Sequence, residues 1–197
     1  LFLIVANPDA VLPTIRSRCQ TVRFAPLSEA IVTAQALTQG LVATDEEARR
    51  LAGVAGGSLA AARRLAQPGL RELRHDWLAE LQQRPWDGIV TARKLTERVE
   101  KLAQDTAEQR QISHWLLETA AEFYRGALRS LALVTDPRQA DLAATNWAAS
   151  WRHDLDGAVD TFGELLERCQ LAARHIEQNV SLGLCWEALC SDLARLS

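Results

Sequence analysis

The sequence predicts a mainly helical protein that begins with a short piece of α/β structure and continues as a small three-helix unit and a longer helical bundle. Apolar residues recur every three or four positions along most of the chain after residue 27, which is the period of amphipathic helices. Residues that favour helix caps precede several of these stretches, and glycine or proline follows several of them. The strand-like runs both lie before Pro26.

The composition is that of an ordinary globular protein. The chain has 197 residues, of which 48% are apolar and 24% charged, so it can form one large domain or two small ones. Its formal net charge of −3 argues against a nucleic-acid coat protein, although a local basic patch is still possible. No apolar run approaches the roughly 20 residues of a membrane span, and the first six residues are too few for a secretory signal.

The four cysteines form no C-x-x-C pair and have no zinc-site spacing. Scattered cysteines without an export signal indicate reduced thiols, and hence a cytoplasmic protein. Cys169 falls on an apolar helical stripe, so we expect it to pack in a core rather than to react. The chain has no methionine and opens within a strand-like run, which predicts that it is the C-terminal part of a longer protein.

The chain starts with two strand-like pieces. Residues 1–6 (LFLIVA) are a short, continuous apolar run, which predicts one buried strand. A proline-containing loop follows. Residues 21–24 (TVRF) then predict a second short β-like piece, which ends before Pro26.

Three short helices are predicted next, because each stretch of helical period lies between a capping residue and a helix-ending residue. These pairs of boundary residues are Ser28 and Gly40, Thr44 and the glycines 56–57, and Ser58 and Pro68. Thr44 and Glu47 also have the spacing of a capping box. We therefore expect a small three-helix bundle.

Residues 69–197 predict a bundle of about five longer helices, each with one apolar face. Asp87 is the expected cap of one helix, Thr106 with Gln109 the capping box of the next, and residues 136–137 (Asp-Pro) a helix break. The five apolar stripes are Leu70, Leu73, Trp77 and Leu81; Ala92, Leu95, Val99 and Leu102; Ile112, Trp115, Leu116, Phe123, Ala127 and Leu131; Leu155, Phe162, Leu165, Leu166, Cys169, Ala173 and Ile176; and Leu182, Trp186, Leu189, Leu193 and Leu196.

Few residues indicate a catalytic site of the chain's own. The histidines lie far apart, so we expect no metal site and place them on the surface or in satisfied core positions. They are His75, His114, His153 and His175. The run GVAGGS, residues 53–58, lacks the phosphate-loop pattern and predicts a helix stop followed by a cap. The arginine-rich stretch 63–74 could touch a nucleic-acid backbone, but it has no interleaved aromatic residues, so surface charge is the favoured interpretation.

One motif remains, LPTIRSRCQ at residues 12–20. From its chemistry alone it is a turn with a surface arginine, but it closely resembles the Ser-Arg-Cys motif of AAA+ clamp-loader subunits. The resemblance implies that Arg18 reaches across a subunit boundary to ATP bound by a neighbouring chain. It also implies that Thr14 and Ser17 position this arginine finger, and that Cys19 packs rather than reacts. A guanidinium suits the role, because it is always charged and its planar fork matches phosphate oxygens.

The resemblance extends over nearly the whole chain. Residues 26–65 resemble the three-helix AAA+ lid, and HIEQNVSLGLCWEALCSDL, residues 175–193, resembles the end of the collar domain in bacterial DNA polymerase III clamp-loader subunits of the delta-prime type. It implies three parts: the end of an AAA+ core, a lid, and a helical collar that oligomerises. Their expected ranges are 1–26, 27–68 and 69–197.

Two departures from the family pattern indicate the type of subunit. Family members that hydrolyse ATP carry a second-sensor arginine two residues beyond the lid serine, where this chain has Ala60, and the arginines 63–64 lie further on. The first-sensor position falls near residues 5–6, with Asn7 the only polar candidate. A subunit that supplies an arginine to a neighbour's ATP site but lacks the two ATP sensors resembles the non-hydrolysing, stator-like delta-prime type.

The resemblance implies a function in DNA replication. The chain would help to load the sliding clamp on primed DNA within a DNA-directed DNA polymerase (nucleotidyltransferase) holoenzyme, with the gamma/tau and delta subunits as partners and no membrane. This stretch would have no catalytic activity and no cofactor of its own, because ATP would sit on the neighbouring subunit. Two alternatives stay open: an ATP-hydrolysing gamma/tau subunit, against which Ala60 argues, and a helical interaction module with an accidental Ser-Arg-Cys.

Overall fold

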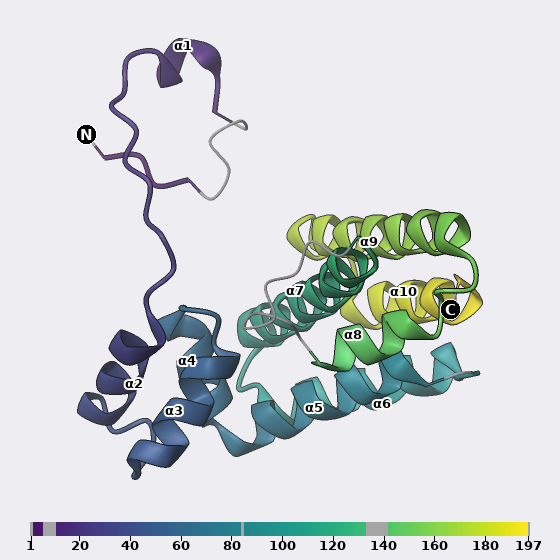
Figure 1. Cartoon of the computed structure of the whole chain (residues 1–197), viewed down its shortest axis with the longest axis horizontal. Helices are drawn as coiled ribbons and strands as arrows, with labels where there is room; N and C mark the ends of the chain where they lie inside the picture. The colour runs from purple at the N-terminus through teal and green to yellow at the C-terminus, as the bar shows by residue number, and fades with distance from the viewer. Residues whose placement is uncertain (1, 6–10, 84, 133–141, 197) are drawn as a thin grey trace. The chain divides into compact units, whose positions relative to one another are not determined.

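The computed structural model describes residues 2–5, 11–83, 85–132 and 142–196, and the chain divides into two compact units, Leu1–Ala66 and Gln67–Ser197. The described residues form ten helices and no strand, so the prediction of a mainly helical fold is confirmed (Figure 1). The helices are short in the first unit and mostly longer in the second, as the apolar pattern predicts.

The first unit contains a single helical turn followed by a small bundle. The turn is α1 (Pro13–Arg16), and the bundle consists of α2 (Glu29–Thr38), α3 (Asp45–Val54) and α4 (Leu59–Ala66). In the bundle, α2 packs against both other helices. The buried core side chains are Val32, Ala36, Ala48, Leu51, Ala52, Ala55, Ala62 and Leu65. With so few large side chains the core is small, which is typical of a unit of this size.

The predicted capping residues do cap the helices of this bundle. Ser28 and Ser58 each accept a hydrogen bond from the N–H three residues on, at 3.4 Å and 3.2 Å. Thr44 and Glu47 form a complete capping box, because each backbone N–H donates to the other side chain at 3.3 Å. Hydrogen bonds from Thr44 favour the ionised form of Glu47 and so lower the pKa of its carboxyl group.

The two predicted strands are not formed in the described residues. Residues 2–5 and 21–24 have no regular secondary structure. Their large apolar side chains are exposed, with Phe2 at 98% and Phe24 at 93%. The physical reason is that a strand needs a hydrogen-bonded neighbour, and the described part of the chain supplies none. The two ends of the first predicted strand, residues 1 and 6, lie outside the described residues.

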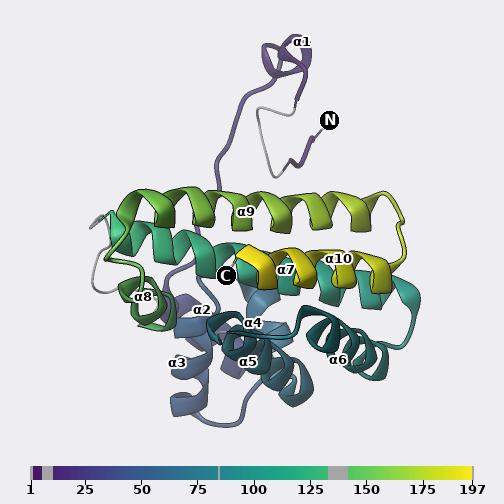
Figure 2. The ribbon, with the colours of Figure 1, turned by 90° about the vertical axis from the view of Figure 1, so that its right-hand side faces the viewer.

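The second unit is a bundle of six helices in the described residues. These are α5 (Pro68–Gln82), α6 (Gly88–Leu102), α7 (Thr106–Leu131), α8 (Leu142–Ala149), α9 (Leu155–Glu177) and α10 (Leu182–Leu196). α7 packs along α9 and against α8, and α10 packs on both α6 and α9. Figure 2 shows α9 running beside α7 and α10.

Aromatic side chains dominate the core of this unit. Trp77 of α5 is fully buried and donates an indole hydrogen bond to the carbonyl of Leu116 at 3.1 Å. It also meets Trp186 of α10 edge to face, with ring centroids 5.7 Å apart. In a second cluster Trp147 stacks on Phe162 at 4.8 Å. All six tryptophans of the chain lie in the second unit.

Two helix starts differ from the predicted ones. Pro68 not only follows α4 but occupies the first turn of α5, where its missing N–H costs nothing. Asp105 caps α7 by accepting a hydrogen bond from the N–H of Glu108 at 2.8 Å, so the predicted capping box of Thr106 and Gln109 is wrong. The shift has a physical reason, since aspartate is a stronger N-cap than threonine. The prediction that Asp87 caps its helix is confirmed.

Most residues of the five predicted stripes are buried, and the two exposed ones, Leu102 and Leu155, lie at helix ends. The pattern does not predict α8, because its eight residues are too few to show an apolar period. The predicted break at residues 136–137 lies outside the described residues, and α7 ends at Leu131.

The turn between α9 and α10 is fixed by an asparagine and an arginine. Asn179 has a φ of 62°, a left-handed conformation that asparagine tolerates better than most residues. The N–H of Val180 donates to the carbonyl of His175 and the N–H of Asn179 to that of Ile176, both at 3.1 Å, which is a Schellman motif. Arg110 of α7 donates to the carbonyls of Ile176 and Val180 at 2.9 Å and 3.4 Å, so it ties this turn to α7.

Gly88 permits a close crossing of α6 and α10. A Cβ at this position would lie 2.4 Å from the carbonyl oxygen of Cys190, a backbone atom that cannot easily move aside. We expect Gly88→Ala to lower the free energy of unfolding by about 1–3 kcal/mol, the usual cost of overpacking. Urea unfolding followed by circular dichroism measures the change.

The matched control for this prediction is Gly163→Ala on α9, because a Cβ there would meet nothing within 4 Å. It should raise the free energy of unfolding by about 0.5–1 kcal/mol through helix propensity. A Gly88→Ala variant as stable as the parent protein would contradict the close crossing.

Candidate functional site

The Ser-Arg-Cys motif begins on the single helical turn α1. The N–H of Ser17 donates to the carbonyl of Pro13 at 2.9 Å, and the N–H of Arg18 donates to that of Ile15 at 3.0 Å. The Ser17 hydroxyl donates to the carbonyl of Thr14 at 3.3 Å. The structure thus brings together the two residues that were expected to support Arg18, and it orders the backbone just before the arginine.

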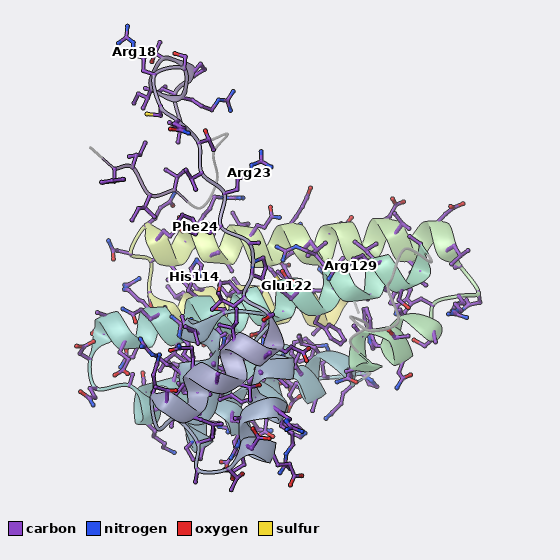
Figure 3. The ribbon with its side chains drawn as sticks, turned by 60° about the vertical axis from the view of Figure 1, so that its left-hand side comes forward. Arg18, Arg23, Phe24, His114, Glu122 and Arg129 are labelled. Carbon is purple, nitrogen blue, oxygen red and sulfur yellow. The ribbon has the colours of Figure 1, made fainter. Side chains whose placement is uncertain are left out.

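The side chain of Arg18 is exposed and points away from the loop (Figure 3). Within the described part of the chain, its guanidinium has no hydrogen-bond or ion-pair partner. Residues 11–27 contain three arginines and no acidic residue. This segment is therefore positively charged and has no carboxylate within it to neutralise the charge.

Cys19 is exposed, so the expectation that it packs is wrong for the described structure. The reason is that no described element covers this loop. Cys169 and Cys190 are buried, and burial raises the pKa of Cys169 to about 12 and also raises the pKa of Cys190. Both thiols stay protonated at neutral pH, in agreement with the packing role predicted for Cys169.

The segment that follows the motif is anchored to the turn between α3 and α4. The N–H of Leu27 donates to the carbonyl of Gly57 at 3.0 Å. Gly57 has a φ of 78°, and a Cβ there would lie 2.6 Å from both the Leu27 carbonyl oxygen and the Pro26 Cβ. The sequence reading of GVAGGS as a helix stop followed by a cap is confirmed, but it misses this contact, which glycine alone permits.

The positions compared with the ATP sensors of the family carry no free polar group in the described residues. Ala60 is exposed on α4. Arg63, one turn along, donates to the side-chain carbonyl of Gln39 through Nε at 3.1 Å and Nη2 at 2.9 Å. Val5 is exposed, whereas Ala6 and Asn7 lie outside the described residues. Arg63 is therefore engaged within its own unit.

The histidines occupy surface or half-buried positions, as predicted. His75 is exposed, and its Nδ1 lies 3.3 Å from the carboxylate of Asp76. A hydrogen bond from Arg98 lowers the pKa of that carboxyl group. Among the described residues, no three or more potential ligands converge on a common metal position. No described helix combines the length and the apolarity that crossing a bilayer requires.

The comparisons with known proteins assign no family to the chain. No protein-family model matches it, and neither the curated proteins nor the solved structures include a match. The residues of the chain and their geometry are therefore the basis on which a function can be proposed.

Proposed function

We propose that this chain is the C-terminal part of a delta-prime-type subunit of a bacterial DNA polymerase III clamp loader. It acts in the cytoplasm with gamma/tau and delta subunits, which together load the sliding clamp on primed DNA. Its contribution to the chemistry is Arg18, donated to the ATP site of a neighbouring subunit. The observation that carries the proposal is the Ser-Arg-Cys loop: an exposed arginine without a described partner, on an ordered turn, in a segment free of acidic residues.

A guanidinium in this setting can do what the proposal requires. Negative charge on the transferring phosphoryl group is stabilised by an arginine from a neighbouring chain, an effect worth roughly 10³–10⁵ in rate. Such an arginine should be unpaired in its own chain, and its backbone should be ordered beforehand, because ordering on binding costs entropy. Among the described residues Arg18 meets the first condition, and the hydrogen bond between Ser17 and Thr14 supports the second.

The exposed apolar residues near the N-terminus support the same proposal. Residues 3–5 and 19–24 line one hollow of about 580 Å³. Large exposed apolar patches are typical of surfaces that another element covers. In the proposal, these segments complete a sheet with the rest of an AAA+ core, which would bury Phe2 and Phe24.

We assign residues 1–26 to the end of that core, 27–68 to a lid and 69–197 to a collar. A hydrolysing gamma/tau subunit is the less favoured candidate, because Ala60 and the engaged Arg63 leave the second-sensor role unfilled. A helical interaction module without a nucleotide link remains the outcome if Arg18 has no effect on a neighbouring ATP site.

The chain alone should neither bind nor hydrolyse ATP, because it has no phosphate loop and Arg63 is held by Gln39. Calorimetric titration with ATP and magnesium measures this, and micromolar binding would contradict it. Arg18→Ala is the matched variant: if the parent binds ATP and the variant does not, the arginine acts within its own chain.

Removing residues 69–197 should abolish co-purification with the other clamp-loader subunits, because the proposal places oligomerisation in the collar. Residues 67–197 form a compact unit with its own core, so this piece expressed alone is the matched control and should still co-purify. Circular dichroism checks that both pieces are helical. Normal assembly of the piece without residues 69–197 would show that the collar assignment is wrong.

A further inference from the structure

The segment that carries Arg18 is held to the three-helix bundle at its far end, where residues 26–27 meet the turn between α3 and α4. The N–H of Leu27 donates to the carbonyl of Gly57 at 3.0 Å. The next residue, Ser28, caps α2, so this contact lies directly where the chain enters the bundle. The path from the arginine segment into the bundle is therefore fixed at the turn that contains Gly57.

Two features of Gly57 require a glycine, whereas its neighbour Gly56 has only one of them. Both residues are in the left-handed region, with φ of 78° and 56°, which glycine adopts without strain. A Cβ on Gly57 would also lie 2.6 Å from the carbonyl oxygen of Leu27 and 2.6 Å from the Cβ of Pro26, closer than real Cβ atoms approach. A Cβ on Gly56 would meet nothing within 4 Å. A side chain on Gly57 alone would therefore push residues 26–27 off the turn.

The anchor matters because the chain between it and the arginine has no rigid structure of its own. Residues 20–28 form neither helix nor strand in the described structure. The nine residues from Arg18 to Leu27 can span up to about 30 Å, so a segment released at Leu27 could place the guanidinium almost anywhere within that reach. Catalytic groups do not tolerate such freedom, since a misplacement of about 1 Å can cost on the order of 10²-fold in rate.

We propose that Gly57 is a positioning residue for Arg18. It fixes residues 26–27 on the three-helix bundle, and this anchor limits where the arginine segment can extend toward the neighbouring ATP site. The inference rests on the function proposed above, in which the bundle joins the arginine segment to the assembling residues 69–197. It also gives the run GVAGGS, residues 53–58, a role that does not involve a phosphate: its second glycine pair keeps the space in which the segment is bound.

The first test measures the anchor itself in the full chain, by amide hydrogen exchange followed by nuclear magnetic resonance. Gly57→Ala should speed the exchange of the Leu27 amide about tenfold, because that amide loses its acceptor. Gly56→Ala is the matched control: it introduces the same left-handed strain without the crowding, and it should change the exchange at Leu27 much less. Unchanged exchange inside α3 checks that the bundle stays folded in both variants.

The second test measures the consequence for the neighbouring site, as DNA- and clamp-stimulated ATP hydrolysis by the reconstituted loader. Gly57→Ala should lower the rate toward that of Arg18→Ala, while Gly56→Ala stays near the parent rate and subunit assembly is unchanged. In the Arg18→Ala background, Gly57→Ala should slow the reaction no further, because the residue acts through the arginine. A merely structural role of Gly57 would add its loss in both backgrounds.

Each outcome decides for or against the anchor. Equal exchange at Leu27 in Gly57→Ala and Gly56→Ala would overturn the proposal, and so would equal ATPase rates for these two variants or a further loss in the Arg18→Ala background. If Arg18→Ala slows hydrolysis and Gly57→Ala does not, this inference fails and the proposed function stands. If Arg18→Ala has no effect, the proposed function fails, and the positioning role of Gly57 fails with it.

Discussion

In a reconstituted clamp loader, Arg18→Ala should slow the ATP hydrolysis that DNA and the clamp stimulate, while folding and subunit assembly stay largely intact. The neighbouring site would lose the charge partner of its transition state, which is worth roughly 10³–10⁵ in rate at that site. The steady-state loss would be partial, because other interfaces keep their own arginines. Folding should be spared, since Arg18 is exposed and has no side-chain partner in the described ranges, and a substitution at such a surface position changes stability by no more than about 0.5 kcal/mol.

The measurements are steady-state ATPase and clamp-loading rates on purified complexes. Arg18→Lys should restore little activity, because an ammonium lacks the planar fork that meets two phosphate oxygens. Arg23→Ala is the charge-matched control: it removes one positive charge from the same exposed segment, outside the Ser-Arg-Cys motif (Figure 3). Equal ATPase rates for the parent and Arg18→Ala would contradict the proposal that Arg18 is an arginine finger. If Arg23→Ala lowered the rate as much as Arg18→Ala does, the cause would be a general effect of charge.

Trp77→Ala should lower the free energy of unfolding of the second unit by about 3–5 kcal/mol, a large part of the stability of a domain of this size. Trp77 is fully buried, and it contacts both α7 and α10, so its removal would leave a large cavity in the core. The substitution would also leave the Leu116 carbonyl without its indole donor. Urea unfolding followed by far-UV circular dichroism measures the loss.

Trp77→Phe separates packing from the hydrogen bond. It keeps an aromatic ring against Trp186 but removes the indole donor, so it should cost clearly less than Trp77→Ala. Leu184→Ala on the exposed face of α10 is the control and should stay within about 0.5 kcal/mol of the parent. If Trp77→Ala and Leu184→Ala lowered the free energy of unfolding by similar amounts, the packing of Trp77 would not be a main source of the stability of this core.

The helices of this chain are largely predictable from sequence because their signals are local. The capping box of Thr44 and Glu47 lies within one turn, and the apolar stripe through Leu73 and Trp77 follows the helical period. Both features can therefore be predicted from the local sequence. The misplaced cap at Thr106 shows the limit of this reading. Asp105, which directly precedes Thr106, caps the helix instead, because aspartate is the stronger N-cap.

Structural features that depend on residues far away in the sequence are harder to predict. Residues 2–5 have the composition of a buried strand, but a strand forms only beside another strand. For the candidate site, the resemblance implies that Thr14 and Ser17 support Arg18, but the hydrogen bond between them and the anchoring of Leu27 by Gly57 are known only from the structure. The ion pair between His114 and Glu177 joins residues far apart in the chain, so no local sequence pattern indicates it.

The placement of every tryptophan in the second unit gives the chain a built-in optical label. The single tyrosine lies there too, so near-ultraviolet emission follows residues 67–197 alone, whereas the far-ultraviolet signal follows the helices of both units. The melting of the two units can thus be separated in one cuvette without a dye. Coincident curves would mean one cooperative transition, and displaced curves would give each unit a stability of its own.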